Sequence, residues 1–198
     1  MYKSETARHR EYYESYINSD NIIDLGFGGD KVTSNAVSSD LPSPLSHTGD
    51  DNNDIPADIT KGLPIESNRF DVVYSSHLIE DFIDTASILN EMIRILKDGG
   101  RLILMFPDEQ RYRKNTPSGR NGHHKHLNMG LAFMKSRMRE VSQRFGHRIT
   151  TVYERDNPED FEGYNVILIC DIEKETLSEE ERSKIYVSSL PMETMWGK

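Results

Sequence analysis

The apolar positions along the chain fall into two patterns, short continuous runs and residues spaced as on one face of a helix. Short runs bounded by turn residues predict buried strands, and helical spacing predicts amphipathic helices. The predicted strands cover residues 21–25, 35–39, 70–75, 101–106, 148–153 and 164–171. The predicted helices cover residues 4–18, 85–96 and 131–145. Strands that alternate with helices indicate an open α/β sheet, which binds ligands at the carboxyl ends of its strands.

Turn residues and polar stretches predict where these elements end. Gly99 and Gly100 are expected to stop the second helix, and Pro107 is expected to end the strand that follows it. Residues 41–54 are rich in Pro, Ser, Gly, Asp and Asn, which predicts a loop. The polar stretch 108–130 is expected to be mostly irregular.

Length and composition narrow the class of protein. A chain of 198 residues suits a single domain, with residues 1–20 as an N-terminal helix or lid, 21–172 as the core, and 173–198 as a C-terminal helix and tail. The formal net charge of −9 argues against nucleic acid or a membrane surface as a partner, because both are polyanionic. Cys170 is the single cysteine, which excludes an internal disulfide. The N-terminal residues contain no apolar run of the signal-peptide type, so we expect a cytoplasmic protein.

The first candidate site is the segment Asp24–Asp30, DLGFGGD, at the exit of the first predicted strand. Glycines there allow a sharp turn and the close approach of a ligand. A dinucleotide-binding turn needs a further glycine where Lys31 stands, and a Walker loop is absent. A carboxylate beside such a turn suits a cationic or amino ligand, although a plain strand-to-loop turn is the alternative.

Two further candidates lie beside the 70–75 strand. Asp58 and Ile59 precede a turn and are suited to an adenine edge, or Asp58 simply caps a turn. The segment 75–81, SSHLIED, follows the strand and therefore lies where ligands bind. Its structural alternative is capping of a helix by Ser76, with the two acidic residues in the first turn.

These segments together resemble the class I S-adenosylmethionine-dependent methyltransferases, in particular those of type 11. The segment IIDLGFGG at residues 22–29 is similar to the family's first motif. The more specific parts of the resemblance are FDVVYSSHLIED (70–81) and RILKDGGRLIL (94–104). The resemblance implies a Rossmann-like sheet of seven strands, mostly parallel with an antiparallel final hairpin and with helices on both faces. It also implies S-adenosylmethionine as the cofactor.

The resemblance implies a role for individual residues of this chain. Ser75 and His77 are placed between the sulfonium and the methyl acceptor. The cofactor residues are Asp24, Gly26 and Gly28 for the methionine half, Asp40 for the ribose hydroxyls, and Asp58 and Ile59 for the adenine. Only residues 30–34 separate the glycine turn from the second strand, where the family has a helix, so the register of Asp40 stays open.

A hydroxyl acceptor needs a base near its line of attack. The candidates are His77, Asp108, Glu109 and the segment 123–126, HHKH, of which we favour His126. Asp108 and Glu109 follow the fifth strand and are expected to face the acceptor. Histidines and carboxylates together can also ligate a divalent ion, and a solvated basic loop is the plainer alternative. We expect no metal.

The expected function is methyl transfer to a hydroxyl of a small-molecule or glycan acceptor, foremost as a sugar O-methyltransferase. This acceptor follows from a looser likeness of the PDEQ and HKH segments to methyltransferases of glycans and other small molecules. The alternatives are a methyltransferase-like partner subunit without catalysis, an enzyme acting on a carboxylate or other metabolite, and a nicotinamide-dependent oxidoreductase. The sequence leaves a monomer and a homodimer equally open.

Overall fold

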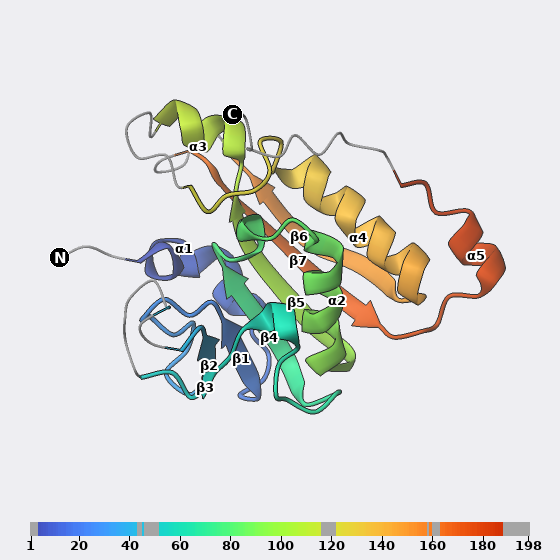
Figure 1. Ribbon diagram of the computed structural model, residues 1–198, viewed down its shortest axis with the longest axis horizontal. Helices are drawn as coiled ribbons and strands as arrows, with labels where there is room; N and C mark the ends of the chain where they lie inside the picture. Colours follow the sequence, from blue (N-terminus) through green and yellow to red (C-terminus); the bar gives the residue numbers. More distant parts are fainter. Residues whose placement is uncertain are drawn as a thin grey trace.

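The computed structural model describes residues 4–42, 45, 52–115, 122–157, 159 and 163–187. Strands and helices alternate as predicted, together with three short 3₁₀ helices labelled η (Figure 1). The elements are α1 (Glu5–Tyr13), η1 (Glu14–Tyr16), β1 (Ile22–Leu25), β2 (Val37–Asp40), β3 (Ile55–Pro56), η2 (Ile59–Lys61), β4 (Phe70–Ser76), η3 (Ile79–Asp81), α2 (Thr85–Ile95), β5 (Leu96–Pro107), α3 (Glu109–Asn115), α4 (Leu131–Phe145), β6 (Arg148–Asp156), β7 (Asn165–Glu173) and α5 (Glu179–Ser183).

The seven strands form one sheet in the order β3-β2-β1-β4-β5-β7-β6. Every neighbouring pair is parallel except those that include β7, which runs antiparallel to both β5 and β6. This confirms the predicted Rossmann-like sheet with its antiparallel final hairpin. The strand order reverses between β1 and β4, so the carboxyl ends of these two strands mark the ligand-binding edge.

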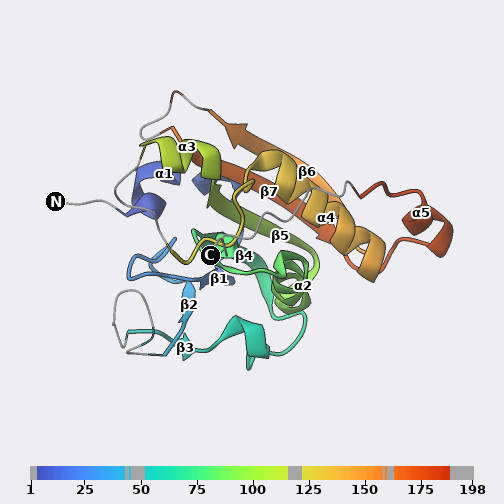
Figure 2. The same cartoon turned by 45° about the horizontal axis from the view of Figure 1, so that its top comes forward.

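Helices cover both faces of the sheet, but unequally. Helices α2 and α4 lie side by side on one face and bury the larger core against it (Figures 1 and 2). On the other face α1 and η1 cover a smaller core, in which Tyr13 packs on Tyr74. The β1–β2 connection contains no helix in the structure, and it contributes Val32 and Ala36 to this smaller core. None of the described helices has the length and apolar character needed to cross a membrane.

The glycines do not end α2, contrary to the prediction. The helix stops at Ile95, and β5 begins at Leu96, so that Gly99 and Gly100 lie within the strand. Leu96 is fully buried and pairs with Phe70 at the start of β4. Burial of this apolar side chain in the sheet therefore ends the helix before the glycines are reached.

The prediction of an irregular 108–130 segment was also wrong in part, because residues 109–115 form α3. Asp108 accepts the backbone N–H of Arg111 at 3.0 Å, which is the geometry of an N-cap. The side chain that α3 buries is the carboxyl of Glu109, so the helix carries no apolar face that a hydrophobicity pattern would reveal. The predicted cap at Ser76 is likewise absent, since η3 begins after Leu78 without a side-chain cap.

Candidate cofactor and acceptor site

The glycine turn after β1 lies at the switch point between β1, β2 and β4. Gly26 and Gly28 adopt positive φ values of 70° and 56°, which favour glycine. The N–H of Gly26 donates to the carbonyl of Ser39 at 2.8 Å, and the N–H of Gly28 donates to Asp40 Oδ2 at 3.3 Å. Asp40 is the last residue of β2 and lies beside the turn, which settles the register left open by the sequence.

Leu78 packs directly over this turn. A Cβ atom added at Gly26 would lie 2.9 Å from Leu78 Cβ, whereas one added at Gly28 would meet only the Gly26 carbonyl oxygen at 3.8 Å. Gly26 thus permits the close approach of the segment after β4. Gly28 leaves open space on the side of the turn that Asp40 borders.

Asp24 is a buried carboxyl at the base of the turn. Its side chain is 1% exposed and accepts the N–H of Val32 at 2.7 Å. Burial in an apolar environment disfavours the charged form and raises the pKa of Asp24 to about 8. A cation held beside this carboxyl would favour its ionised form, so the donor set fits a ligand that carries an amino or sulfonium group.

The other predicted cofactor residues already have partners in the protein. Asp58 caps η2 by accepting the N–H of Thr60 at 3.0 Å, and its bonds to Thr60 and Lys61 lower its pKa. Ile59 packs in the larger core. Ser75 donates its hydroxyl to the carbonyl of Leu25 at 3.0 Å and so ties β4 to β1. Their predicted contacts with adenine and the sulfonium stay predictions.

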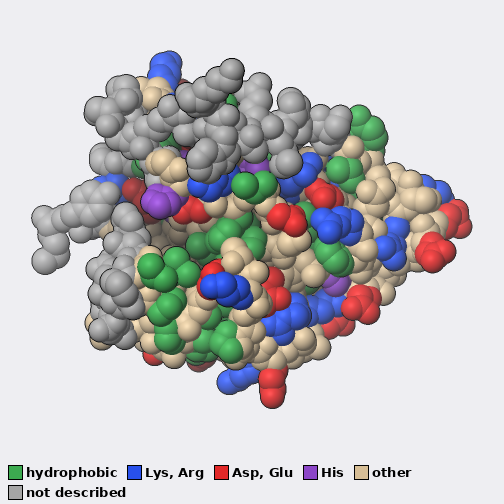
Figure 3. Space-filling model, in the orientation of Figure 1, with side chains coloured by type: hydrophobic (Ala, Val, Ile, Leu, Met, Phe, Trp, Pro, Cys, Tyr) green, Lys and Arg blue, Asp and Glu red, His purple; other side chains and the backbone are tan. Residues whose placement is uncertain are grey.

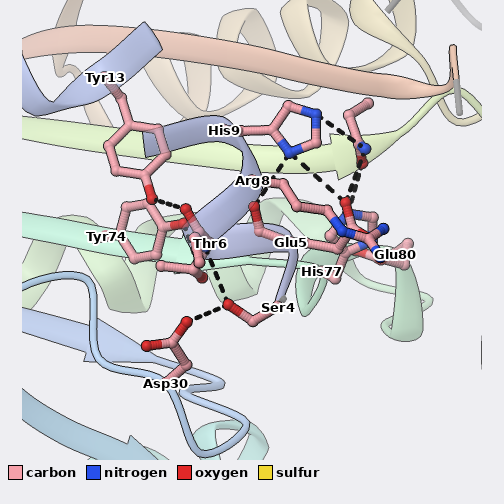
Figure 4. Close-up of polar contacts among 12 residues, drawn as sticks. Ser4, Glu5, Thr6, Arg8, His9, Tyr13, Asp30, Tyr74, His77 and Glu80 are labelled. Atoms are coloured by element: carbon pink, nitrogen blue, oxygen red, sulfur yellow. Dashed lines mark hydrogen bonds and ion pairs between the residues drawn. The ribbon is translucent and has the colours of Figure 1, made fainter. Parts of the chain in front are cut away.

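His77 follows β4 in the left-handed conformation, with φ of 51°. Its ring lies between two acceptors, with Nδ1 3.1 Å from Glu80 Oε1 and Nε2 2.7 Å from Asn165 Oδ1 (Figure 4). Burial lowers the pKa of His77, but the bond to Glu80 and its charge outweigh this and bring the pKa to about 9. At neutral pH the ring is therefore an imidazolium that donates two hydrogen bonds, which is unsuited to a general base.

A second imidazole–carboxylate pair lies after β5. His124 Nδ1 is 2.7 Å from Glu109 Oε2, and the two side chains are 3% and 1% exposed. Arg113 donates to the other oxygen of Glu109 at 2.6 Å. His124 Nε2 points toward Glu80, 3.8 Å from Oε1. The two pairs therefore meet at Glu80, whose Oε2 atom is buried without a partner.

Two of the predicted bases lie apart from this group. His126 Nε2 is 2.8 Å from the carbonyl oxygen of Phe82 and 3.1 Å from Thr85 Oγ1, and burial lowers the pKa of its ring. His126 therefore anchors its loop to the start of α2. Asp108 caps α3 and pairs with Arg111. Of the four predicted catalytic residues, the structure brings His77 and Glu109 into one network.

Sequence reasoning did not single out Asn165, Glu80 or Glu5 as members of this network. Asn165 lies at the start of β7 and joins His77 to α1, whose residues are far away in the sequence. No local motif marks such a residue, because its partners lie on α1 and at the end of β4, far from β7 in the sequence. His124 carried a weak signal, since it stands within a cluster of histidines on a polar loop.

No group of three or more His, Cys, Asp or Glu side chains within the described ranges is arranged to hold a metal ion. Two cavities of about 480 and 700 Å³ lie away from the ligand-binding edge. The first borders η1 and the β1–β2 connection, and the second lies between α4, the start of β6 and residues 177–186. On the face drawn in Figure 3, basic and acidic side chains are interspersed rather than gathered by sign.

Comparison with known proteins gives this geometry a family context. Residues 24–104 match the family model described as a methyltransferase domain. A comparison with curated protein sequences gave no match.

Solved structures of S-adenosylmethionine-dependent methyltransferases share the fold at low sequence identity. The protein from Thermotoga maritima is 17% identical with a TM-score of 0.62, covering 85% of this chain and 89% of its own. The Archaeoglobus fulgidus protein is 14% identical with a TM-score of 0.58, covering 84% of this chain and 92% of its own. The Mesorhizobium loti protein is 13% identical with a TM-score of 0.59, covering 83% of this chain and 98% of its own. Residues 24–104 thus resemble a methyltransferase domain, and the chain has the fold that these S-adenosylmethionine-dependent methyltransferases share.

Proposed function

We propose that the protein transfers a methyl group from S-adenosylmethionine to a hydroxyl of a small-molecule or glycan acceptor, foremost a sugar. Methyl transfer from a sulfonium is an in-line displacement, in which the protein mainly positions the reactants and excludes water. A neutral hydroxyl must also lose its proton. The observation that carries the proposal is the buried Glu109–His124 pair after β5, the strand next to β4 at the switch point.

The cofactor site in this proposal is the glycine turn with its two carboxylates. Gly26 and Gly28 let the backbone approach the ligand, Asp40 offers acceptor oxygens for the ribose hydroxyls, and Asp24 faces a cationic group. S-adenosylmethionine supplies an electrophilic methyl group when bound. Asp58 and Ile59 keep their proposed place around the adenine through the backbone of the η2 turn, because their side chains serve the cap and the core.

His124 takes the role of base in this proposal, a role that the sequence left open among His77, Asp108, Glu109 and the 123–126 segment. Glu109 accepts the Nδ1–H of His124 and so leaves the lone pair on Nε2, the atom that points toward Glu80. In the proposed reaction Nε2 receives the hydroxyl proton as the oxygen–methyl bond forms. His77, charged and fixed between two acceptors, holds Glu80 in place beside this atom.

Calorimetric titration of the purified protein tests the cofactor first. We expect binding of S-adenosylmethionine and S-adenosylhomocysteine in the micromolar range, because the glycine turn and the carboxyl groups of Asp24 and Asp40 are already in place in the free protein. We expect no binding of NAD⁺, since the turn lacks the third glycine of that motif. Binding of NAD⁺ in place of the sulfonium pair would favour an oxidoreductase, and no binding of any of the three would favour a non-catalytic partner subunit.

Release of S-adenosylhomocysteine in the presence of a panel of sugars tests the acceptor and the base. His124→Gln is expected to lower turnover by roughly 10²–10⁴-fold with little change in cofactor affinity. His123→Gln, on the exposed neighbouring histidine, is the matched control and should keep wild-type turnover. Full activity of His124→Gln would remove this base, and turnover with carboxylate acceptors alone would replace the hydroxyl assignment.

A further inference from the structure

The helix α1 is held to the protein mainly by polar contacts. Of its three buried residues, Thr6 and His9 are polar, and Tyr13 at the last turn is the one that packs in a core. By contrast, α2 is anchored by a continuous apolar face made of Ala86, Ile88, Leu89, Met92, Ile93 and Ile95. A hydrogen-bonded contact that exchanges with water contributes little net free energy, so the first two turns of α1 are poised to open and close.

One set of contacts fastens α1 to the segment that follows the glycine turn. The hydroxyl of Ser4, which also caps α1, donates to the carboxylate of Asp30. One turn from the end of the helix, the guanidinium of Arg10 donates to the carbonyl of Val32, the residue whose N–H binds Asp24. The helix thus contacts the β1 side of the switch point along its length.

A second set fastens α1 to the end of β4 across β7. Glu5 Oε2 accepts Nδ2–H of Asn165 at 2.9 Å, and Asn165 Oδ1 accepts the Nε2–H of His77 at 2.7 Å. Figure 4 shows Glu5 and His9 of α1 beside His77 and Glu80. The Asn165 amide donates toward α1, where His9 Nε2 also lies 3.3 Å from its Nδ2, and it accepts from His77, so its orientation is fixed from both sides. The chain of bonds then continues from His77 to Glu80 at 3.1 Å.

We propose that α1 is a reversible cover over the cofactor edge, latched by Glu5 through the Asn165 amide to His77. The helix reaches both sides of the switch point, from Asp30 beyond the glycine turn to His77 at the end of β4. Its covering role rests on the proposed cofactor site, whereas the latch itself rests on the contacts of the free chain. Ligand entry and release require the first turns of α1 to lift.

The latch also depends on pH. The groups that face His77 are Glu80 from η3, Glu5 from α1 and the neutral Asn165 from β7, with the Tyr164 ring edge-on. The charged ring donates to both of its acceptors, and the proton that makes this arrangement possible is lost as the pH rises through about 9. The latch is therefore fully bonded at neutral pH. In alkaline solution it loses the bond from His77 to Glu80, whereas the bond from His77 Nε2–H to Asn165 needs only the neutral ring.

Hydrogen exchange of the free protein tests the latch without any ligand. Glu5→Ala removes the carboxylate that holds Asn165, and Glu11→Ala removes an exposed carboxylate from the same helix as a control. We expect exchange in residues 5–9 to increase about tenfold in Glu5→Ala only, while α2 and α4 keep wild-type exchange. Exchange that stays at the wild-type level, or that rises equally in α2 and α4, would overturn the proposal, since α1 would then be a fixed part of the fold.

Stopped-flow binding of S-adenosylmethionine tests the cover. Glu5→Ala is expected to raise both the association and the dissociation rate constant severalfold, with Glu11→Ala at the wild-type rates. Unchanged rates in Glu5→Ala would remove the covering role. Absence of binding in the wild-type protein would instead overturn the proposed function, and the exchange experiment would still decide the latch.

Discussion

At the scale of single residues, the site shows how neighbours decide the charge of a buried group. Burial raises the pKa of Asp24 to about 8 and outweighs its one backbone hydrogen bond and the nearby charge of Lys31, which both lower the pKa. His77 is also buried, but the carboxylate of Glu80 outweighs desolvation and raises its pKa to about 9. Each group therefore carries a proton at neutral pH in the free protein.

Asp24 is expected to make the protein less stable as the pH rises. Its pKa is about 8 when folded and near the ordinary 3.8 when unfolded, so the unfolded chain loses its proton first. The free energy of unfolding should therefore fall as the pH rises from about 4 to 8. Asp24→Asn removes this titration and keeps an oxygen for the N–H of Val32.

Thermal unfolding at pH 5 and pH 8.5 measures this effect. We expect Asp24→Asn to unfold at a higher temperature than wild type at pH 8.5, with a smaller difference at pH 5. Glu66→Gln, at an exposed position, is the control and should follow the wild-type profile. An Asp24→Asn variant with the same pH dependence as wild type would contradict the assigned shift.

At the scale of elements, the glycine turn and η3 are fitted to each other. Leu78 occupies the space where a side chain at Gly26 would lie, so the turn after β1 and the segment after β4 come together at one edge. This contact explains why the glycine turn and the segment 70–81 both contribute residues to the site. The same edge receives α3 through the cap at Asp108.

Replacing Gly26 and Gly99 by alanine, one at a time, separates the effect of backbone strain from that of the contact with Leu78. Gly26 and Gly99 have nearly equal φ values of 70° and 72°, but an added Cβ meets Leu78 at Gly26 and nothing within 4 Å at Gly99. Gly99→Ala is expected to lose about 1–2 kcal/mol of unfolding free energy through the left-handed conformation alone. Gly26→Ala should lose more unfolding free energy than Gly99→Ala, and it should also weaken binding of S-adenosylmethionine.

Urea unfolding and calorimetric titration of the two variants check this pair. Both variants carry the same backbone strain, so any additional loss of unfolding free energy in Gly26→Ala measures the cost of displacing Leu78. Equal stabilities and an unchanged cofactor affinity in Gly26→Ala would remove the glycine turn from the proposed cofactor site.

At the scale of the whole molecule, the sheet brings the ends of β1, β2, β4 and β5 to one edge (Figure 1). The elements α1, η3 and α3 contribute side chains there. The described part of the chain offers no three-ligand metal cluster at this edge. The proposed chemistry is accordingly carried by an imidazole and carboxylates.

Chelation by EDTA is therefore expected to leave the rate of S-adenosylhomocysteine release unchanged. The measurement compares the untreated protein, the protein dialysed against EDTA, and the dialysed protein with added Mg²⁺. Loss of turnover on dialysis that Mg²⁺ restores would show that a divalent ion takes part and would contradict this expectation.

Local sequence patterns were enough to predict most helices and strands and the α/β fold class. Apolar runs and helical spacing located six of the seven strands and the helices α1, α2 and α4, because burial of an apolar face leaves a periodic pattern in the chain. The two-residue strand β3 (Ile55–Pro56) is too short to leave such a pattern and was missed. The glycine turn and the segment after β4 were also readable, since their residues are consecutive. α3 and the true start of β5 were not, because polar burial at Glu109 and strand pairing at Leu96 leave no such period.

The side chains that form the site are brought together by folding, and local sequence patterns do not show which of them meet. Asn165 lies 88 residues from His77 and 160 from Glu5, and His124 lies 15 residues from Glu109, so folding alone makes these pairs. The choice between His124 and His126 depends on which ring meets a carboxylate and which meets a backbone carbonyl. Such contacts, together with burial, set the charge of each group, and none of these quantities is a property of a local sequence.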